Sequence, residues 1–468
     1  MAPTNTLTGT TGNDFLSAPG SVATLVQGLA GNDTINLRLS GDYAQAGAGN
    51  DILNLSAISN YSGSVVAGDG NDSITYSAST NGASFAANSG NDTIVFNGAF
   101  VNTTIGAGEG NDSLNLSGTI TTTDINAGKG ADTLTLGGTF TVVTLQASDG
   151  QDRISATGLF TDSLSQISLG KGTDSIQLGG TGVIGTVAGG GLADTISFAA
   201  NAGAVTVYGD ALGVTTEGTG TAGAADGADV ISFSSAIAST SVYGAGANDT
   251  ISFGAAATGA GIVDGGNGAD SISTTATVSG TVTVSGGNGF DTITLNTIGG
   301  SALVLGGAGA DSIKIAGTGS AYLSGSINGG DGNDTISLQN TGGGATVADL
   351  ATVNGGAGVD LIGFNLTGIG VTLATAGEYI SNVVYEAGDT FRLGTGLSAD
   401  SALVNFVGGA PTVYVSTTSS LTSGLGQAGS IAVYDSGDNL VIGVATGAAG
   451  SGFALINVIN GDDMLKLT

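Results

Sequence analysis

Aspartate is the residue type whose spacing in this sequence points to chemistry. Seventeen aspartates share a short motif, usually with glycine two places before the Asp and always with Ile or Leu two places after it. Glycine turns can direct backbone carbonyls toward one point, and oxygens from carbonyls and carboxylates suit a hard cation such as Ca²⁺. The candidate metal ligands are Asp14, Asp33, Asp51, Asp72, Asp92, Asp112, Asp132, Asp152, Asp174, Asp194, Asp229, Asp249, Asp270, Asp291, Asp311, Asp334 and Asp360.

The remaining composition excludes most other chemistry. The 468 residues contain no His, Cys or Trp, so a Ser-His-Asp triad, a Cys-His dyad and a conventional zinc site are all impossible. We therefore expect no catalytic residues, no organic cofactor and no enzymatic activity. Seven Lys and Arg residues face 37 Asp and Glu residues, and a net charge of −30 argues against nucleic acid as a partner. No run of 18 apolar residues predicts a membrane span, and residues 1–11 lack the features of a signal peptide.

The motif recurs with a period near 20 residues, which is typical of a repeat architecture. Apolar residues two and four places after each Asp alternate with polar ones, which predicts a short strand with one buried face. A second, looser apolar segment precedes each glycine turn, for example at Val65, Ile105, Leu145 and Leu305. Two strands and two turns in 20 residues form one coil. The sequence thus predicts an all-β, parallel β-roll or β-solenoid of about 17 coils.

The turns resemble the RTX (hemolysin-type) calcium-binding repeat, whose pattern is G-G-x-G-x-D-x-U-x. Residues 306–315 (GGAGADSIKI) and 329–338 (GGDGNDTISL) match it best, and the resemblance covers residues 9–364. It implies Ca²⁺ between the turns of adjacent coils, held by Asp carboxylates and turn carbonyls. The RTX turn recurs every nine residues, whereas this one recurs about every 20, and we expect no acid in the opposite turn, as in STNGASF, SGTITTT and GGTFTVV. We therefore expect one row of calcium on one edge, with up to about 16 ions between 17 turns.

Two regions depart from the period. Residues 209–228 form a Gly-, Thr- and Ala-rich interruption with Asp210, Glu217 and Asp226, predicted as a loop leaving the solenoid, where a stray ion site is conceivable. The predicted domains are the solenoid at 1–364 and a β-rich region at 365–468, which would cap the last coil. The C-terminal NGDDMLKLT resembles the uncleaved signal of type I secretion, which implies export to the bacterial surface or the extracellular space without an N-terminal signal peptide.

These expectations favour a structural role over catalysis. The sequence is similar to RTX-bearing surface-layer (S-layer) and extracellular fibril proteins, which implies self-assembly into a filament or a surface lattice. The partner would be a second copy of the chain, with cell-surface polysaccharide as a further possibility. The alternative is a calcium-dependent ice-binding or adhesin-type rod. The residue three places before the Asp varies among types as different as Asp69, Glu109 and Lys129, which makes a poor ice template. Several turns also spell Asn-Asp-Ser or Asn-Asp-Thr, which we interpret as an accidental match to the glycosylation sequence.

Overall fold

The computed structural model is all β and contains no helix among the residues it describes, and hence no helix long and apolar enough to cross a membrane. Those residues are 3, 5–55, 58–180, 182, 184–200, 203–211, 226–317, 325–340, 352–365, 380–384, 390–393, 402–406, 413–416, 431–435, 439–445, 453–460 and 464–466. They belong to two compact units, one of residues 1–235 with 240–245 and one of residues 236–239 with 246–468. Each unit contains a parallel β-solenoid, so the predicted fold class is confirmed.

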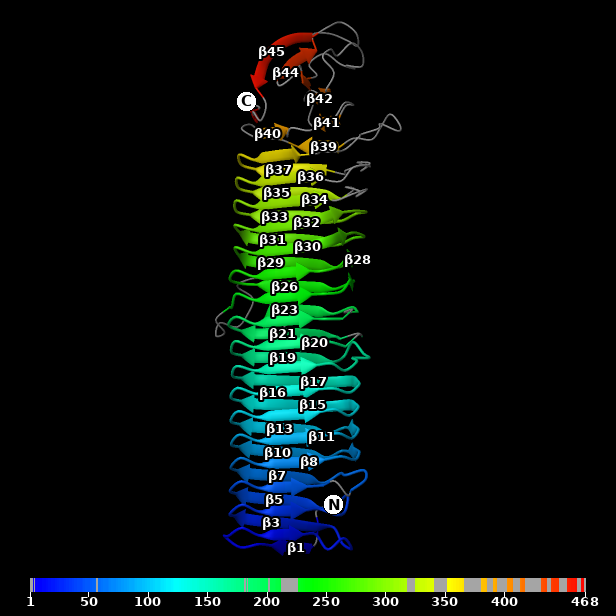
Figure 1. The fold of residues 1–468 in the computed structure, drawn as a ribbon, viewed down its shortest axis with the longest axis vertical. Helices are drawn as coiled ribbons and strands as arrows, with labels where there is room; N and C mark the ends of the chain where they lie inside the picture. Colours follow the sequence, from blue (N-terminus) through cyan, green and yellow to red (C-terminus); the bar gives the residue numbers. More distant parts are fainter. Residues whose placement is uncertain are drawn as a thin grey trace. The chain divides into compact units, whose positions relative to one another are not determined.

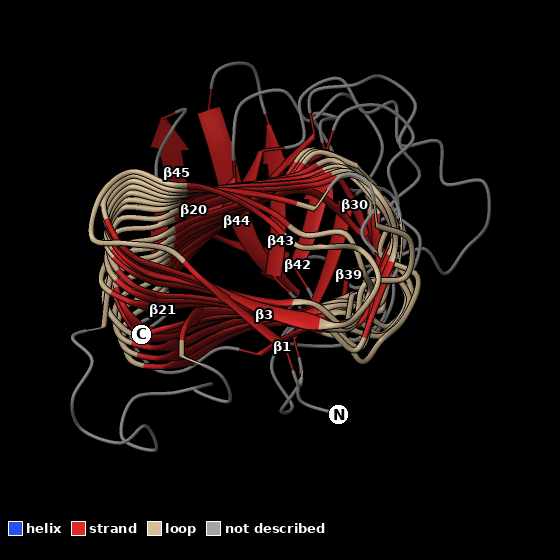
Figure 2. Ribbon diagram, turned by 90° about the horizontal axis from the view of Figure 1, so that it is seen from below, coloured by secondary structure: helices blue, strands red, loops and turns tan. Residues whose placement is uncertain are grey.

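Each coil of the first unit contributes a strand to two sheets (Figures 1 and 2). The strands of sheet A precede the glycine turns, and those of sheet B follow them. Sheet A contains β1 (Asn5–Thr8), β3 (Thr24–Ala30), β5 (Tyr43–Ala48), β7 (Ser64–Asp69), β9 (Thr80–Asn81), β10 (Ser84–Ser89), β12 (Phe100–Val101), β13 (Thr104–Glu109), β15 (Ile120–Lys129), β17 (Phe140–Asp149), β19 (Gln166–Lys171), β21 (Thr186–Gly191), β23 (Thr206–Asp210) and β26 (Ser241–Ala245). Sheet B contains β2 (Phe15–Ser17), β4 (Thr34–Asn36), β6 (Ile52–Asn54), β8 (Ser73–Tyr76), β11 (Thr93–Phe96), β14 (Ser113–Leu116), β16 (Thr133–Leu136), β18 (Arg153–Ala156), β20 (Ser175–Leu178), β22 (Thr195–Phe198) and β24 (Val230–Phe233).

The second unit repeats this arrangement. Its sheet A contains β29 (Ile262–Gly268), β31 (Thr283–Gly289), β33 (Leu303–Ala308), β35 (Ser326–Asp331), β37 (Thr352–Ala357), β39 (Ile380–Val384), β41 (Ala402–Phe406), β42 (Val413–Ser416), β43 (Ile431–Asp435), β44 (Asn439–Ala445) and β45 (Phe453–Asn460). Its sheet B contains β25 (Ile237–Ala238), β27 (Thr250–Phe253), β28 (Ala257–Thr258), β30 (Ser271–Val278), β32 (Thr292–Ile298), β34 (Ser312–Gly317), β36 (Thr335–Asn340), β38 (Leu361–Asn365), β40 (Thr390–Leu393) and β46 (Met464–Lys466).

The register of sheet B follows the sequence period. Every one of the seventeen motif aspartates directly precedes a strand of this sheet, and equivalent residues pair between coils, as Ile94 pairs with Leu114 and Leu114 with Leu134. The Ile or Leu two places after each Asp is buried throughout. A one-residue slip would turn these side chains to solvent, so their burial keeps consecutive coils in register.

The core between the sheets is a narrow, mainly aliphatic seam that also holds an aromatic cluster and two stacked aromatic pairs, Phe140 with Phe160 and Phe198 with Phe233. In the first unit Tyr61, Tyr76, Phe85, Phe96 and Phe100 are buried, and the rings of Phe85 and Phe96 lie 4.6 Å apart. Burial of large rings within adjacent coils stabilises the stack, because a single coil has no second layer of its own to cover its apolar face.

The predicted second strand that contains Leu305 is confirmed as β33. Within it Leu305 is only half-buried, whereas its neighbour Val304 is fully buried. Successive side chains of a strand point to opposite faces, so only one of two adjacent apolar residues can enter the core.

The predicted domain boundary at 364 and 365 remains a prediction. Parallel pairing continues past it, since β40 pairs with β38 with Thr390 opposite Leu361. Further along, antiparallel pairs join β41 to β42, β43 to β44 and β44 to β45, so the described part of 365–468 is β-structured as expected. Of the proposed secretion signal, residues 461–463, 467 and 468 lie outside the described residues.

The interruption at 209–228 is described only at its two ends. Strand β23 enters it at Asp210, and residue 226 forms an isolated bridge with Leu192. Residues 212–225, including Glu217, lie outside the described residues. Beyond the interruption, β24 pairs with β22 in the same register as earlier strands, with Ile231 opposite Ile196.

Candidate metal centre

The motif aspartates form a hydrogen-bonded ladder within each unit. The backbone N–H of each Asp donates to Oδ1 of the Asp in the following coil, as from Asp92 to Asp112 and from Asp112 to Asp132, each at 2.7 Å. The interruption does not break the ladder, because the N–H of Asp194 donates to Oδ1 of Asp229 at 2.7 Å. The first unit thus aligns the aspartates from Asp14 to Asp229 and the second those from Asp249 to Asp360.

A second ladder of asparagines runs beside the first in the opposite direction. Oδ1 of Asn71 accepts a hydrogen bond from the backbone N–H of Asn91, and Oδ1 of Asn91 accepts one from Asn111, both at 2.7 Å. The sequence interpretation missed this role, although the frequent Asn directly before the motif Asp was a visible signal. Alternating donors and acceptors along two adjacent columns hold the turns at a constant spacing.

The second carboxylate oxygen of the ladder is buried and, at most positions, has no hydrogen-bond partner. Buried polar atoms are nearly always paired, so each unpaired acceptor in this column calls for either a bound proton or a bound cation. The positions at which Oδ2 is buried without a partner include Asp33, Asp51, Asp72, Asp92, Asp112, Asp132, Asp152, Asp174, Asp194, Asp270, Asp291, Asp311 and Asp334. Asp14 differs, because the N–H and the hydroxyl of Thr10 both donate to its Oδ2.

Burial also opposes ionisation of the ladder. Loss of solvent around the carboxylates raises their pKa, and the charges of neighbouring ladder residues raise the pKa of several of them further, while the N–H donated to Oδ1 lowers it. The pKa rises to about 6 for Asp51, Asp270, Asp291, Asp311 and Asp334, to about 7 for Asp72, Asp112 and Asp152, and to about 8 for Asp194 and Asp229. A bound cation would reverse this effect by stabilising the ionised form.

Two further columns of glycines bring backbone oxygens close to the edge of the solenoid that carries the Asp ladder. Four and two places before the Asp, glycines such as Gly108 (φ +119°) and Gly110 (φ +131°) adopt positive φ. A Cβ at either position would lie under 3.0 Å from a backbone oxygen of the preceding coil. Backbone conformation and space therefore both favour glycine, although a few coils hold another residue at positive φ in these columns, such as Asn88 (φ +82°), and the turns stack with their backbones in contact.

The donor set fits a hard cation if the backbone takes part. In the part of the chain that the structure describes, no group of three or more Asp or Glu side chains comes together to hold a metal. A six- to eight-coordinate ion would accordingly take most of its ligands from turn carbonyls, with the ladder Oδ2 atoms supplying the charge. The structure is thus a β-solenoid with a stacked Asp ladder, compatible with a row of cation sites.

The opposite edge carries acids that the sequence interpretation overlooked. Asp42 lies between β4 and β5 and accepts hydrogen bonds from the N–H groups of Thr24, Arg38 and Leu39 at 2.8 to 2.9 Å. Asp162, between β18 and β19, likewise accepts bonds from neighbouring backbone N–H groups, and these hydrogen bonds lower its pKa although burial acts to raise it. Both carboxylates are satisfied by protein donors, so they act as turn caps and need no ion.

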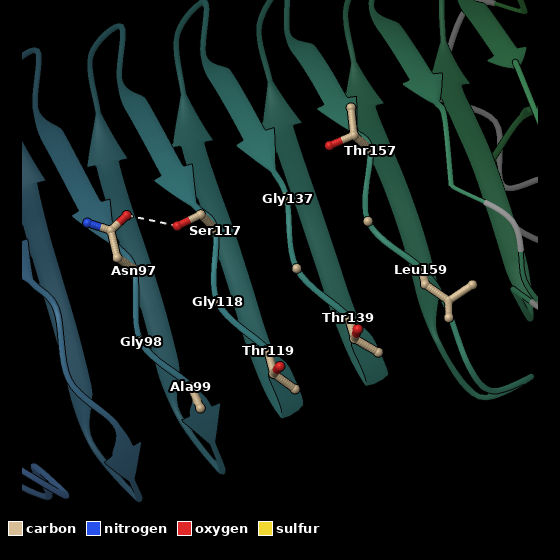
Figure 3. A pocket seen from close by; sticks show the side chains of 12 residues that line it. Asn97, Gly98, Ala99, Ser117, Gly118, Thr119, Gly137, Thr139, Thr157 and Leu159 are labelled. Atoms are coloured by element: carbon tan, nitrogen blue, oxygen red, sulfur yellow. Dashed lines mark hydrogen bonds between the residues drawn. The ribbon is translucent and has the colours of Figure 1, made fainter.

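A shallow groove of about 560 Å³ also lies on this edge (Figure 3). Gly98, Gly118 and Gly138 form its floor, and a Cβ at Gly118 would lie under 3.0 Å from the backbone oxygen of Gly98. Asn97 and Ser117 border it and share a 2.8 Å hydrogen bond. Close stacking of the coils accounts for the glycine floor, so no ligand is needed to explain the groove.

Neither the protein-family models nor the curated protein sequences contain a match to this chain. The resemblance to RTX repeats therefore depends on the turn motif and on the ladder geometry described above.

Proposed function

We propose that the protein is a secreted, calcium-binding structural protein whose solenoid folds and assembles when Ca²⁺ occupies the glycine turns. The observation that carries this proposal is the column of buried Oδ2 atoms without partners in both units. A Ca²⁺ row would supply the missing positive charge and would offset much of the net charge of −30. Without it, buried carboxylates a few ångströms apart would have to be protonated or would repel one another.

This proposal links folding to location. Extracellular calcium modules bind with dissociation constants of roughly 10⁻⁴ to 10⁻³ M, so sites of that strength would stay empty in the cytosol and fill after export. Because the ligands come from two coils at once, the free energy of binding becomes free energy of folding. The absence of His and Cys from the chain supports a structural rather than a catalytic role.

A calcium titration tests the binding proposal directly. Protein stripped with a chelator is titrated with Ca²⁺ while far-ultraviolet circular dichroism is recorded, and a parallel titration with Mg²⁺ serves as the control. We expect chelated protein to have a weaker β-sheet signal and a lower unfolding midpoint, both of which Ca²⁺ raises cooperatively at lower concentration than Mg²⁺, because Mg²⁺ dehydrates reluctantly. An unchanged spectrum and an unchanged unfolding midpoint in excess chelator would refute the proposal.

Self-assembly is supported by the edges of the first coil. Among the described residues, β1 pairs only with β3 and β2 only with β4, so each strand has an outer edge of backbone donors and acceptors. Such edges pair readily with another chain, and a head-to-tail contact between copies continues into a polymer unless it closes. Sedimentation velocity with and without millimolar Ca²⁺ tests this step. Calcium-dependent polymers are expected, and a monomer at high protein concentration in Ca²⁺ contradicts the assembly role.

A further inference from the structure

The residue five places before the ladder Asp divides the turns into two classes. A Cβ added to any of the six glycines of this column that are named next would lie under 3.0 Å from Oδ2 of its Asp. Glycine occupies it at Gly28, Gly189, Gly265, Gly286, Gly306 and Gly329, which precede Asp33, Asp194, Asp270, Asp291, Asp311 and Asp334. Alanine or leucine occupies it at Ala46, Ala67, Ala87, Ala107, Ala127, Ala147 and Leu169, which precede Asp51, Asp72, Asp92, Asp112, Asp132, Asp152 and Asp174.

The backbone does not require glycine in this column. Gly265 and Gly286 have no positive φ, in contrast to the adjacent Gly266 (φ +102°) and Gly287 (φ +111°). The equivalent residue in other coils, such as Ala107, carries a side chain in the same fold and is completely buried. The two classes therefore differ in the space beside the carboxylate rather than in backbone conformation.

At the glycine turns two oxygens converge on that space. A Cβ added to Gly265 would lie under 3.0 Å from Oδ2 of Asp270 and from the backbone oxygen of Gly286 in the next coil. The same pair of atoms meets a Cβ added to Gly286, namely Oδ2 of Asp291 and the backbone oxygen of Gly306. The carboxylates of Asp270 and Asp291 are 1% exposed, and their Oδ2 atoms have no hydrogen-bond partner.

An ionised carboxylate and a carbonyl are both acceptors, so they cannot satisfy each other. A cation that shares both oxygens resolves this conflict, and both are ligands of the kind that Ca²⁺ takes. At the alanine turns the methyl group occupies the space on which the oxygens would converge. An ion there would meet an apolar, fully buried group such as Ala107 in place of room for its ligands.

We infer that the cation row is interrupted: ions bind at the six glycine turns and are excluded from the seven consecutive turns between Asp51 and Asp174. This inference rests on the proposed calcium-binding function and narrows it to particular turns. The turn at Asp14 also has glycine in this column (Gly9), but Thr10 already donates two hydrogen bonds to Oδ2 of Asp14, so we expect no ion there. The turns at Asp229, Asp249 and Asp360 are left unassigned. The expected number of bound ions is accordingly about six to nine, against about 16 for a row that fills every slot.

Counting ions in the wild-type protein tests the inference without any variant. The full chain is dialysed to equilibrium against buffer whose free Ca²⁺ lies well above the expected dissociation constant, and bound calcium per chain is the difference between the protein and buffer compartments measured by atomic emission. A ratio of about six to nine supports the inference. A ratio near 16 overturns it and leaves the proposed function intact, whereas a ratio near zero overturns both.

Two reciprocal substitutions locate the ions. Gly286→Ala should lower the ratio by one ion, because its methyl group fills the space beside Asp291. Ala107→Gly should raise the ratio by one, because it opens the equivalent space beside Asp112. Circular dichroism in Ca²⁺ verifies that each variant is folded, and the Ala107→Gly result remains informative if Gly286→Ala is not. Ratios unchanged from wild type in both folded variants would show that this column does not control occupancy.

Discussion

The ladder carboxylates make the stability of the metal-free protein depend on pH, and Asp112 allows a sharp test. Its side chain is 2% exposed, Oδ1 accepts the N–H of Asp92 at 2.7 Å, and Oδ2 has no partner. Burial is the largest cause of the rise in the pKa of Asp112 from 3.8 to about 7, and the charges of neighbouring ladder aspartates add to it.

The sign of the effect follows from proton linkage. Between pH 3.8 and about 7 the folded chain holds a proton on Asp112 that the unfolded chain has lost. The stabilisation that this bound proton adds to the free energy of unfolding is therefore complete below pH 3.8 and is lost as the pH rises through about 7. A shift of about three pKa units corresponds to about 4 kcal/mol.

Asp112→Asn keeps an oxygen for the N–H of Asp92 and removes the titrating group. In excess chelator the variant should match wild type within about 1 kcal/mol near pH 4 and exceed its free energy of unfolding by about 2–4 kcal/mol near pH 8. Urea unfolding followed by circular dichroism at several pH values measures both. Asp112→Ala is the control, since it leaves the buried N–H of Asp92 without an acceptor and should lower the free energy of unfolding by about 1–3 kcal/mol even in acid. An Asn variant whose stability difference from wild type does not change with pH would refute the reasoning.

Four further substitutions, one of them a control, probe the stacking and the core of the first unit. Gly118→Ala should destabilise the protein by about 1–3 kcal/mol or more, because its Cβ would collide with the backbone oxygen of Gly98. The control Gly137→Ala should be tolerated, because the nearest atom to its Cβ lies at 3.5 Å. Urea unfolding midpoints compare the two variants. Phe96→Ala should cost about 3–5 kcal/mol by leaving a cavity in the aromatic cluster, and a loss under 1 kcal/mol in the same assay would contradict this packing. Tyr61→Phe should cost about 1–3 kcal/mol, since its buried hydroxyl donates to a backbone carbonyl at 2.7 Å, and an equally stable variant would mean that water replaces this bond.

Sequence analysis predicted the strands well because the information lies within a few residues. Ile94 lies two places after Asp92, and alternation along the strand determines which side chains enter the core. Alternation alone did not decide which of the adjacent apolar residues Val304 and Leu305 faces inward. The caps at Asp42 and Asp162 were missed because an isolated Asp in a loose turn has no periodic signal.

The period, the acidic column and the lack of His and Cys can all be read from the sequence. The tertiary structure alone decided which atoms of that column are satisfied, since the N–H that reaches Oδ1 of Asp229 comes from Asp194, 35 residues earlier in the chain. It also decided that Oδ2 of Asp270 and the backbone oxygen of Gly286 approach the same space. These contacts join separate coils, and their geometry depends on the rise and register of the stack, which no local pattern of residues specifies.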